Sequence, residues 1–423
     1  MTSRERLIAT LNHKQPDRVV LDIGATSQTG INAGVLYGLR KALGLEERPI
    51  KIQEPAQMLG IVEEDLRKAL NVDVVGLWNP TNTLGVKNEN WKPWTMPDGT
   101  PTLMAGDMAF SRDENYIYTY PQGDTSVPPS MNMPENGYFF DNIDRSDDYD
   151  EDNLNAVEDF KEDFGLFTDD TCRYLETEAK RLFDETEYGI IGMCGGGGFG
   201  DVFTLPACWR KSKPQGIRKL EDWLMAHVLH PDYILDLFEL QLDFALKNLE
   251  MYRQAVGDRI QAVWISGTDF GTQNGTFASV EAYRTLYKPF HKRVNDWVHQ
   301  NTDWKVFYHT CGAIIPLMED FHEAGIDILN PIQCSATGMD PAALKETYGD
   351  KFTFWGGGVD VQQVLPYGTP EQVKAQVKER LAIFSKGGGY IFNGIHNIVG
   401  KTPVENVVAM LEAFDEFVAE NGA

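Results

Sequence analysis

Eight short β-rich runs alternate with stretches of helical periodicity along this chain of 423 residues. Such alternation is typical of strand–helix units whose strands pair in parallel. Eight units predict an α/β fold of the TIM-barrel type, a closed (β/α)8 barrel, with residues 1–423 as one domain. The predicted strands are residues 18–22, 73–76, 189–192, 259–266, 305–309, 327–330, 352–355 and 390–393.

Three of the predicted helices have a clear start. Ser279 is the expected N-cap of a helix over residues 279–300, because a serine hydroxyl can accept a hydrogen bond from a free N–H of the first turn. Thr-Pro pairs begin two more helices, over residues 369–386 and 402–420. Proline suits the first helical position, where its missing N–H has no partner to lose.

The interval between the second and third predicted strands is too long for one helical crossover. Residues 87–141 contain prolines and turn sequences such as Pro97-Asp98-Gly99, which predict β-hairpins. Residues 141–163 are strongly acidic and predict a solvated linker or an exposed helix. We therefore expect residues 87–163 to be an insertion over the barrel mouth. Its aromatic residues either shape a pocket for a ring or pack on one another: Trp91, Trp94, Phe110, Tyr116, Tyr118, Tyr120, Phe139 and Phe140.

Charge and composition exclude several function classes. A formal charge of -25 would repel phosphate backbones, so we expect no nucleic-acid partner. The chain has no apolar run long enough to span a membrane, and its first residues lack the apolar segment of a signal peptide. Five cysteines is an odd number without framework spacing. Together these features predict a cytoplasmic protein.

The end of the fifth predicted strand carries the strongest chemical signal, Tyr308-His309-Thr310-Cys311-Gly312. In a barrel of this type, the catalytic groups lie at the carboxyl ends of the strands. Alternate side chains of an extended segment point the same way, so His309 and Cys311 would face one space. Imidazole and thiolate together suit Zn²⁺. The pair predicts a metal site, and the alternative is a buried histidine beside an inert thiol.

Two further candidate metal ligands follow later strands. Cys334 comes after the sixth strand and could reach the metal or be a small core residue. His396 comes after the eighth strand and could be a ligand, a general acid or base, a substrate contact or a structural histidine. Barrel closure would gather both at one rim with His309 and Cys311. The predicted metal ligands are therefore these four residues.

Other polar residues at the strand ends are candidates for catalysis and binding. Asp269 follows the fourth strand and could orient a ligand, accept a proton or cap a turn. We expect Asp269 and His396 to be catalytic. Gln273, Gln333 and Asn397 are the predicted substrate-binding residues.

Two glycine runs also follow predicted strands, at residues 195–198 and 356–358. Glycine lets a bulky planar ligand approach the backbone closely, so these runs predict room for a large ligand at the mouth. A phosphate-binding loop is the competing interpretation of the first run. It is disfavoured because no Gly-Lys-Ser/Thr sequence follows.

Taken in order, the motifs resemble the uroporphyrinogen decarboxylase superfamily, and within it the cobalamin-dependent methyltransferase branch. The resemblance extends over nearly the whole chain. The segments that carry it are residues 4–12, Pro16-Asp17-Arg18-Val19, residues 269–273, residues 307–312, Trp355-Gly356-Gly357-Gly358-Val359-Asp360 and Thr402-Pro403-Val404-Glu405-Asn406.

The resemblance favours the methyltransferase side of the superfamily. Its decarboxylases bind a porphyrinogen with several carboxylates through an arginine-rich N-terminal loop, and they need no metal. The matching loop here, residues 22–30, contains no arginine. The methyltransferases carry a His-x-Cys…Cys zinc motif, whose first two positions match His309 and Cys311. The alternatives are a decarboxylase and a non-catalytic tetrapyrrole-binding barrel.

The third position of that motif is a departure, because His396 stands where the branch has cysteine. Imidazole can replace thiolate on zinc, or Cys334 can supply the second sulfur. A site richer in nitrogen suits a Lewis acid that acts on oxygen. Such a variant resembles O-demethylating methyltransferases, which move a methyl group from a methoxy-arene to a Co(I) corrinoid protein. Zinc would stabilise the leaving phenolate, and His396 or Asp269 would protonate it.

The resemblance also implies cofactors and partners. Zinc would be resident, and the corrinoid (cobalamin) would arrive on a partner protein. Gly394 stands where the corrinoid-binding signature Asp-x-His-x-x-Gly requires aspartate, so we do not expect His396 to bind a corrinoid itself. The second partner is a small-molecule methyl donor. The sequence is compatible with a homodimer.

Overall fold

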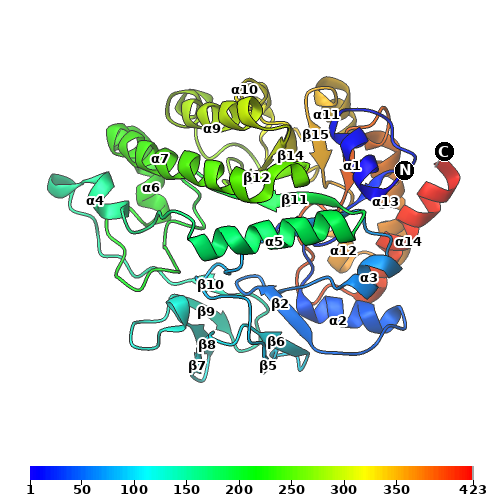
Figure 1. Ribbon diagram of the computed structural model, residues 1–423, viewed down its shortest axis with the longest axis horizontal. Helices are drawn as coiled ribbons and strands as arrows, with labels where there is room; N and C mark the ends of the chain where they lie inside the picture. The colour runs from blue at the N-terminus through cyan, green and yellow to red at the C-terminus, as the bar shows by residue number, and fades with distance from the viewer. Residues whose placement is uncertain (422–423) are drawn as a thin grey trace.

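The computed structural model describes residues 1–421, and its centre is a barrel of eight parallel strands (Figure 1). The strands are hydrogen-bonded in the order β1-β16-β15-β14-β13-β12-β11-β4. All eight predicted strands are present, so the barrel prediction is confirmed. Their bounds are β1 Val20–Leu21, β4 Val74–Leu77, β11 Gly189–Met193, β12 Ala262–Ser266, β13 Lys305–His309, β14 Ile328–Asn330, β15 Thr353–Trp355 and β16 Tyr390–Phe392.

The barrel closes between β1 and β4 through one buried carboxylate. The backbone N–H of Asp73 donates to Leu21 O at 2.8 Å, and Leu21 N–H donates to Asp73 Oδ2 at 2.9 Å. Asp73 is fully buried and also pairs with Arg6 and with Arg18, each at 2.7 Å. Asp73 thus joins the first and last strands of the sheet at the amino end of the barrel.

Apolar side chains fill the inside of the barrel, and helix α1 (Ser3–Leu11) plugs its amino end with Leu7 and Leu11. Thr2 and Glu5 form a capping box that satisfies the first N–H groups of α1. Strand side chains that point inward form one packed core with the plug: Val20, Val74, Ile191, Ala262, Phe307, Ile328, Trp355 and Ile391. The filled interior leaves the carboxyl ends of the strands as the place for a site.

The outer helices begin close to where the sequence predicts. Ser279 accepts from Ala282 N–H, and the helix continues through a π-helical turn at Tyr283–Tyr287 into α9. Thr369 caps α13 with a capping box. The remaining bounds are α2 Ala33–Ala42, α3 Glu64–Ala69, α4 Ala156–Phe160, α5 Asp169–Glu185, α6 Leu220–Leu229, α7 Pro231–Val256, α8 Val280–Ala282, α9 Lys288–Asn301, α10 Met318–Glu323, α11 Pro341–Tyr348, α12 Val364–Tyr367, α13 Pro370–Phe384 and α14 Val404–Asn421.

Two small four-stranded sheets lie together beneath the barrel in the view of Figure 1. The hairpins of residues 87–141 supply most of their strands, but residues 50–60 add two that the sequence does not predict. One sheet has the order β10-β9-β8-β7 and the other β3-β2-β6-β5. Their bounds are β2 Ile50–Glu54, β3 Leu59–Gly60, β5 Lys92–Thr95, β6 Pro101–Met104, β7 Phe110–Arg112, β8 Tyr116–Thr119, β9 Met131–Pro134 and β10 Asp141–Asn142.

The acidic segment 141–163 is held more firmly than a solvated linker would be. The side chain of Asp163 is only 5% exposed, and it pairs with Arg210 at 2.7 Å and with Arg218 at 2.5 Å. Lys213 and Lys219 pair with two exposed aspartates of the same segment. The segment is therefore fixed to residues 210–219 by ion pairs.

The expectation that the glycine run 356–358 leaves room for a large ligand is wrong. A Cβ at Gly356 would meet Gly394 O at 2.9 Å, and one at Gly358 would meet the ring of Phe392 at 2.4 Å. In the other run, a Cβ at Gly197 would meet Ile265 at 2.4 Å. These glycines let the loops pack directly on neighbouring strands, so they are structural.

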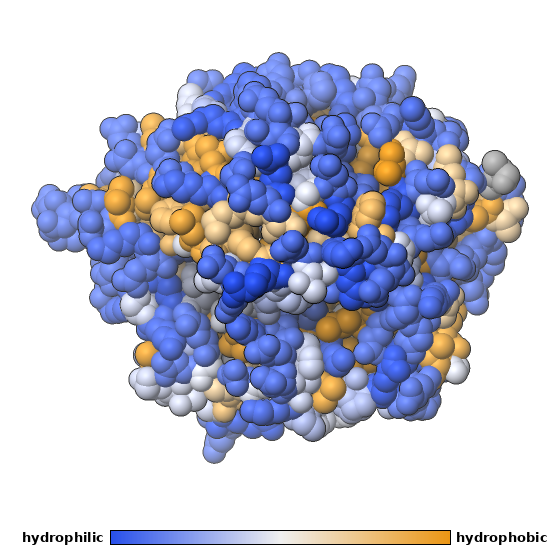
Figure 2. Space-filling model, viewed as in Figure 1, coloured by the Kyte–Doolittle hydropathy of each residue, from blue (hydrophilic) through white to orange (hydrophobic). Residues whose placement is uncertain are grey.

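Most of the face seen in Figure 2 is hydrophilic, in keeping with the charge of -25, and apolar residues show mainly as a band across it. Within residues 1–421, no helix combines the length and the apolar character needed to cross a lipid bilayer.

A buried histidine behind β13 predicts how stability depends on pH. His291 is fully buried, its Nδ1 lies 3.1 Å from the Tyr283 hydroxyl, and burial lowers its pKa to about 3. In the unfolded chain a histidine has a pKa near 6.5, so the unfolded state binds more protons as the pH falls from about 6.5 toward 3. The stability that the neutral imidazole contributes is therefore lost as the pH falls, by about 2 kcal/mol between pH 7 and pH 5.

Urea unfolding at the two pH values, for the wild type and for His291→Phe, measures this contribution. The wild type should lose about 2 kcal/mol more than the variant on going from pH 7 to pH 5. Equal losses in the two proteins would show that His291 is not held neutral in the core.

Candidate metal centre

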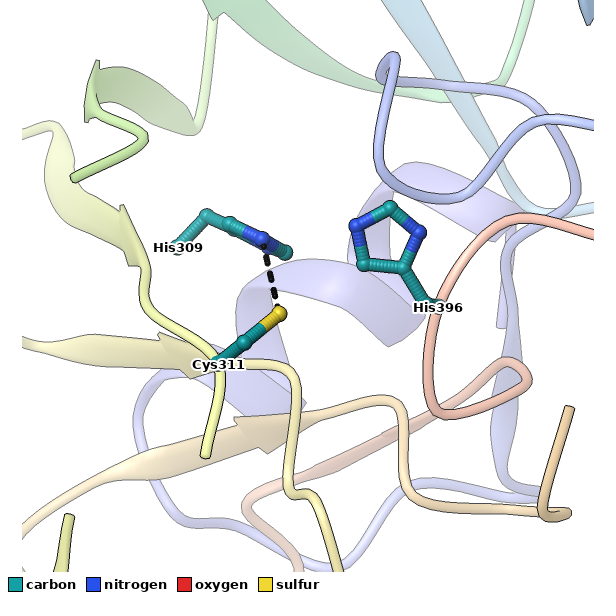
Figure 3. A group of neighbouring side chains, drawn as sticks. All are labelled: His309, Cys311 and His396. Carbon is teal, nitrogen blue, oxygen red and sulfur yellow. Dashed lines mark hydrogen bonds between the residues drawn. The ribbon is translucent and has the colours of Figure 1, made fainter. Parts of the chain in front are cut away.

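Three of the four predicted metal ligands converge at the carboxyl end of the barrel. His309 and Cys311 come from the end of β13 and His396 from the loop after β16, and their side chains point toward one another (Figure 3). One ligand atom from each lies within 4.8 Å of the other two. Cys311 Sγ is 3.4 Å from His309 Nε2, and the two imidazole rings are 5.0 Å apart and nearly perpendicular.

Asn330, at the end of β14, fixes which nitrogen of His309 can bind a metal. Asn330 Nδ2 donates to Trp355 O at 2.8 Å, so its Oδ1 is the end that faces the histidine. His309 Nδ1 lies 2.6 Å from that Oδ1 and must carry the proton to donate to it. The lone pair is then on His309 Nε2, the atom that faces Cys311.

Two glycines allow the loops after β12 and β13 to touch. Gly312 has a φ of +95°, and a Cβ there would meet the backbone of Gly271 at 2.2 Å. Because the loops are so close, Asp269 Oδ1 accepts from Cys311 N–H at 2.6 Å. The same oxygen lies 3.7 Å from His309 Nε2, and the Asp269 side chain is 35% exposed. Asp269 therefore fixes the loop of Cys311 and stands where solvent reaches the cluster.

Burial sets the protonation of the three clustered side chains. It lowers the pKa of His309 to about 4, with a smaller contribution from the neighbouring His396, and it also lowers the pKa of His396. Burial raises the pKa of the Cys311 thiol well above its ordinary value, and the Asp269 carboxylate adds to this effect. Both imidazoles thus keep a lone pair at neutral pH, while the thiol would release its proton only to a bound cation.

The donor set fits zinc. Two imidazoles and one thiol are common zinc ligands, and three protein ligands leave the fourth tetrahedral position open, as in catalytic sites. The hydrogen bond from His309 to Asn330 is the outer support that metal-binding histidines usually have. The residues present can therefore hold a zinc ion with one exchangeable position.

Cys334, the fourth predicted ligand, does not join the cluster formed by the described residues 1–421. Its N–H donates to Ile332 O in a tight turn after β14. Burial raises its pKa to about 12, and the charged groups that also act on it are Arg380, Asp340 and Glu379, none of which belongs to the cluster. The sequence left Cys334 and His396 as alternatives for the third metal ligand. The structure places His396 with His309 and Cys311.

The three predicted substrate-binding residues are engaged within the protein. Gln333 Oε1 accepts from Gly312 N–H at 2.7 Å, and Gln333 Nε2 donates to Gln273 Oε1 at 3.1 Å. Gln273 also donates to Ser335 O. Asn397 donates to Ser27 O at 3.3 Å. These amides fix the loops around the cluster, and their binding to a substrate stays a prediction.

Two cavities lie near the carboxyl end of β4. A cleft of about 720 Å³ runs along β4 and the loop that follows β1, with α5 on one side. A smaller pocket of about 170 Å³ shares four lining residues with this cleft, namely Gln53, Trp78, Asn79 and Thr81. The two cavities therefore meet at the end of β4.

The aromatic residues of the insertion mostly pack on one another. Trp94 packs against Phe110 with ring centres 5.6 Å apart, and the ring centres of Phe110 and Phe140 are 6.3 Å apart. Of the eight aromatic residues predicted to shape a pocket, Trp91 is the one that lines the larger cleft. The aromatic residues at the smaller pocket are Trp78, which follows β4, and Trp264, which lies within β12. Neither is among the predicted site residues.

Asn330 is also absent from the predicted site residues, although one signal points to it. It ends the sixth predicted strand, in register with His309 of the neighbouring strand.

Replacing Asn330 with alanine should weaken zinc binding about 10- to 100-fold, because His309 would lose the acceptor that fixes its tautomer. A competition titration against a chelator measures this affinity.

The matched variant Asn330→Asp keeps an acceptor for His309 Nδ1–H and should retain most of the affinity. Wild-type zinc affinity in Asn330→Ala would mean that this hydrogen bond does not orient a ligand. Thermal unfolding of both variants separates loss of the fold from loss of the site.

Comparisons with known proteins agree with this architecture. The family model for uroporphyrinogen decarboxylase (URO-D) matches residues 143–417. The uroporphyrinogen decarboxylase of Mannheimia succiniciproducens is 27% identical over 181 residues, which cover 42% of this chain and 47% of the relative. That of Psychromonas ingrahamii is 33% identical over 87 residues, which cover 20% of this chain and 24% of the relative. The chain thus spans about half or less of the length of these relatives.

Among solved structures, a methyltransferase from Methanosarcina mazei has the same fold. It superposes with a TM-score of 0.53 over 99% of both chains, at 16% sequence identity. At this identity, the likeness shows the fold.

Proposed function

Because the chain belongs to the uroporphyrinogen decarboxylase family, in agreement with its sequence motifs, we propose that it is a zinc-assisted methyltransferase. It would move a methyl group from a small methylated donor, a methoxylated aromatic compound, to the Co(I) of a corrinoid carried by a partner protein. The observation that carries the proposal is the convergence of His309, Cys311 and His396 within 4.8 Å. The likeness in fold to a methyltransferase supports it.

The set of metal ligands favours a methyl donor in which the methyl group is bonded to oxygen, so that the leaving group is a phenolate. When bound, zinc supplies a Lewis acid that can polarise an ether oxygen and stabilise the phenolate that leaves. One thiolate and two neutral imidazoles leave such a site with more positive charge than a site with two thiolates has. The three residues would hold the ion, and the Asp269 side chain beside them is 35% exposed.

Asp269 is the residue that would transfer a proton to the leaving phenolate. With His396 as a ligand, its imidazole has no second role as an acid. Asp269 Oδ1 is held by Cys311 N–H at 2.6 Å, 3.7 Å from His309 Nε2, so the carboxyl group is positioned beside the proposed zinc site. From this position it can relay a proton from solvent to the phenolate oxygen.

A decarboxylase is the second candidate, because the curated relatives are uroporphyrinogen decarboxylases. Loop 22–30 does not support it. This loop contains no arginine or lysine and closes on itself, with Gly24 N–H bonded to Thr29 O at 2.9 Å and Thr26 N–H bonded to the Thr29 hydroxyl at 3.1 Å. It therefore offers no cation to a substrate with several carboxylates.

The test is a screen of methoxylated aromatic compounds with the zinc-loaded protein and reduced cob(I)alamin, followed by the absorbance of methylcobalamin. We expect methylcobalamin and the matching phenol in equal amounts, and no reaction after the zinc is removed by a chelator. Conversion of uroporphyrinogen to coproporphyrinogen, without methyl transfer from any donor, would favour the decarboxylase instead.

A further inference from the structure

The cleft of about 720 Å³ lies where the barrel meets the inserted sheet and helix α5. It is bounded by β4 and the loop after β1, by β2 and residues 78–91, and by α5. Its volume is within the range of about 300–1,000 Å³ that is usual for small-molecule sites, which often lie between structural units. None of His309, Cys311 and His396 lines the cleft, so a ligand bound there would be separate from the proposed zinc site.

Three aromatic side chains line the cleft. Trp78 and Trp91 are half-buried, and Tyr174 is 42% exposed. None of these rings packs on another aromatic ring within residues 1–421, in contrast to Trp94 and Phe110. A cavity of about 150 Å³ is enough for one benzene ring, so the cleft has room for a larger planar ligand.

The charge of the lining is the reverse of that of the whole chain. The chain has 63 Asp and Glu residues against 38 Lys and Arg residues, whereas the cleft is lined by three acidic residues and four basic ones. The lining therefore favours an anion over a cation. These charged residues are Lys51, Arg67, Lys87, Arg181, Glu89, Asp170 and Glu178.

Four of these seven charged residues are held in ion pairs of the protein itself. Such residues have little charge left for a ligand. The pairs are Arg67–Glu64 at 3.2 Å, Arg181–Glu178 at 2.8 Å and Asp170–Arg173.

The other three charged residues are available to a ligand. Lys51 Nζ lies 3.9 Å from Glu63, whose carboxylate is already held by Arg48 at 2.7 Å. Lys87 and Glu89 form no ion pair within residues 1–421. Two positive charges and one negative charge remain, a net charge of +1. One carboxylate group on a ligand would balance it.

The two lysines belong to the same wall of the cleft. Lys51 and Gln53 alternate along β2, so their side chains point to the same face. Asn88 Nδ2 donates to Gln53 O at 2.9 Å, which holds Lys87 and its neighbours beside β2. The Gln53 side chain has no hydrogen bond within residues 1–421, and it is not buried, so its amide can also donate to an anion.

We propose that this cleft binds a planar aromatic carboxylate of more than one ring. The carboxylate would pair with Lys51 and Lys87 and accept from Gln53 Nε2, and the rings would pack on Trp78 and Trp91. A phosphate ester is disfavoured, because its second negative charge would have no free cation. The site goes beyond the proposed function, since it requires neither zinc nor a corrinoid.

Isothermal titration calorimetry with four probes of one ring system tests the ligand class: 2-naphthoate, 2-naphthamide, 2-naphthyl phosphate and 2-naphthylmethylammonium. We expect 2-naphthoate to bind at least about tenfold more tightly than the amide or the ammonium ion, because only the carboxylate makes charged hydrogen bonds to the lysines. It should also bind more tightly than the phosphate ester.

Substitutions of the two unpaired charges should change this affinity in opposite directions. Lys87→Met should weaken 2-naphthoate binding about three- to fivefold, and Glu89→Gln should tighten it about two- to threefold by removing a like charge. Trp91→Leu should weaken it about three- to tenfold through loss of the ring contact. Lys292→Met, on the outer helix α9, is the matched control and should bind like the wild type.

Absence of 2-naphthoate binding, equal binding of the acid and the amide, or tighter binding of the phosphate ester or the ammonium ion would overturn the proposal. Unchanged affinity in both Lys87→Met and Glu89→Gln would do the same. Circular dichroism confirms that each variant is folded.

A carboxylate can also bind zinc, so the titration is repeated after a chelator has removed the metal. We expect the same affinity, and loss of binding would place the ligand at the metal and overturn the assignment to the cleft. The titration involves no methyl transfer, so its failure is distinct from failure of the proposed function.

Discussion

Replacing Cys311 with serine should remove the bound zinc and lower the rate of methyl transfer by more than about 100-fold. Cys311 is the one ligand of the cluster that becomes an anion on binding the metal, since both imidazoles stay neutral. A serine hydroxyl does not ionise at neutral pH and binds zinc poorly. Metal analysis of the purified protein and the methylcobalamin assay measure the two effects.

Cys334→Ser is the matched control, because it makes the same change at a thiol outside the cluster. It should keep one zinc per chain and an activity close to that of the wild type. If Cys334→Ser lost the zinc while Cys311→Ser kept it, Cys334 would be the sulfur ligand and the assignment of Cys311 would be wrong.

The second large effect is expected on stability. Replacing Asp73 with alanine should lower the free energy of unfolding by about 3–5 kcal/mol. Asp73 is fully buried, and its removal leaves Arg18 without its carboxylate partner and Arg6 with Asp17 alone. It also removes the acceptor of Leu21 N–H, at the join between β1 and β4. Urea unfolding at neutral pH measures the change.

Glu416→Ala provides the comparison. Glu416 also pairs with two cations, Lys374 and Lys378, but its side chain is 43% exposed. Water and salt screen such pairs, so the loss should stay below about 1 kcal/mol. Similar small losses for Asp73→Ala and Glu416→Ala would show that the buried carboxylate does not hold the barrel closed.

The barrel could be predicted from the sequence because its strands are short apolar runs bounded by polar turns. The predicted range 305–309 matches β13, and the other seven agree within a few residues. Strands β2 and β3 were not predictable in this way. They pair with each other and β2 pairs with β6, some 50 residues further on, so their partners are not apparent from local pattern.

Part of the candidate site could be predicted for the same reason. Barrel topology brings strand ends together, and alternation along a strand gives His309 and Cys311 a common direction. Topology does not determine where a loop side chain points. The sequence therefore could not decide between Cys334 and His396 as the third metal ligand. The role of Asn330 depends on the register between β13 and β14, which the sequence does not give. The packing role of Gly197, Gly356 and Gly358 depends on contacts between segments far apart in the chain.

The central claim is that two nitrogens and one sulfur from this chain hold a single zinc ion. Zinc X-ray absorption spectroscopy on the purified protein, together with metal analysis, tests it directly. We predict one zinc per chain with one sulfur at about 2.3 Å and two imidazole nitrogens at about 2.0–2.1 Å. A protein that binds no zinc, or a first shell with two sulfurs, would contradict the account.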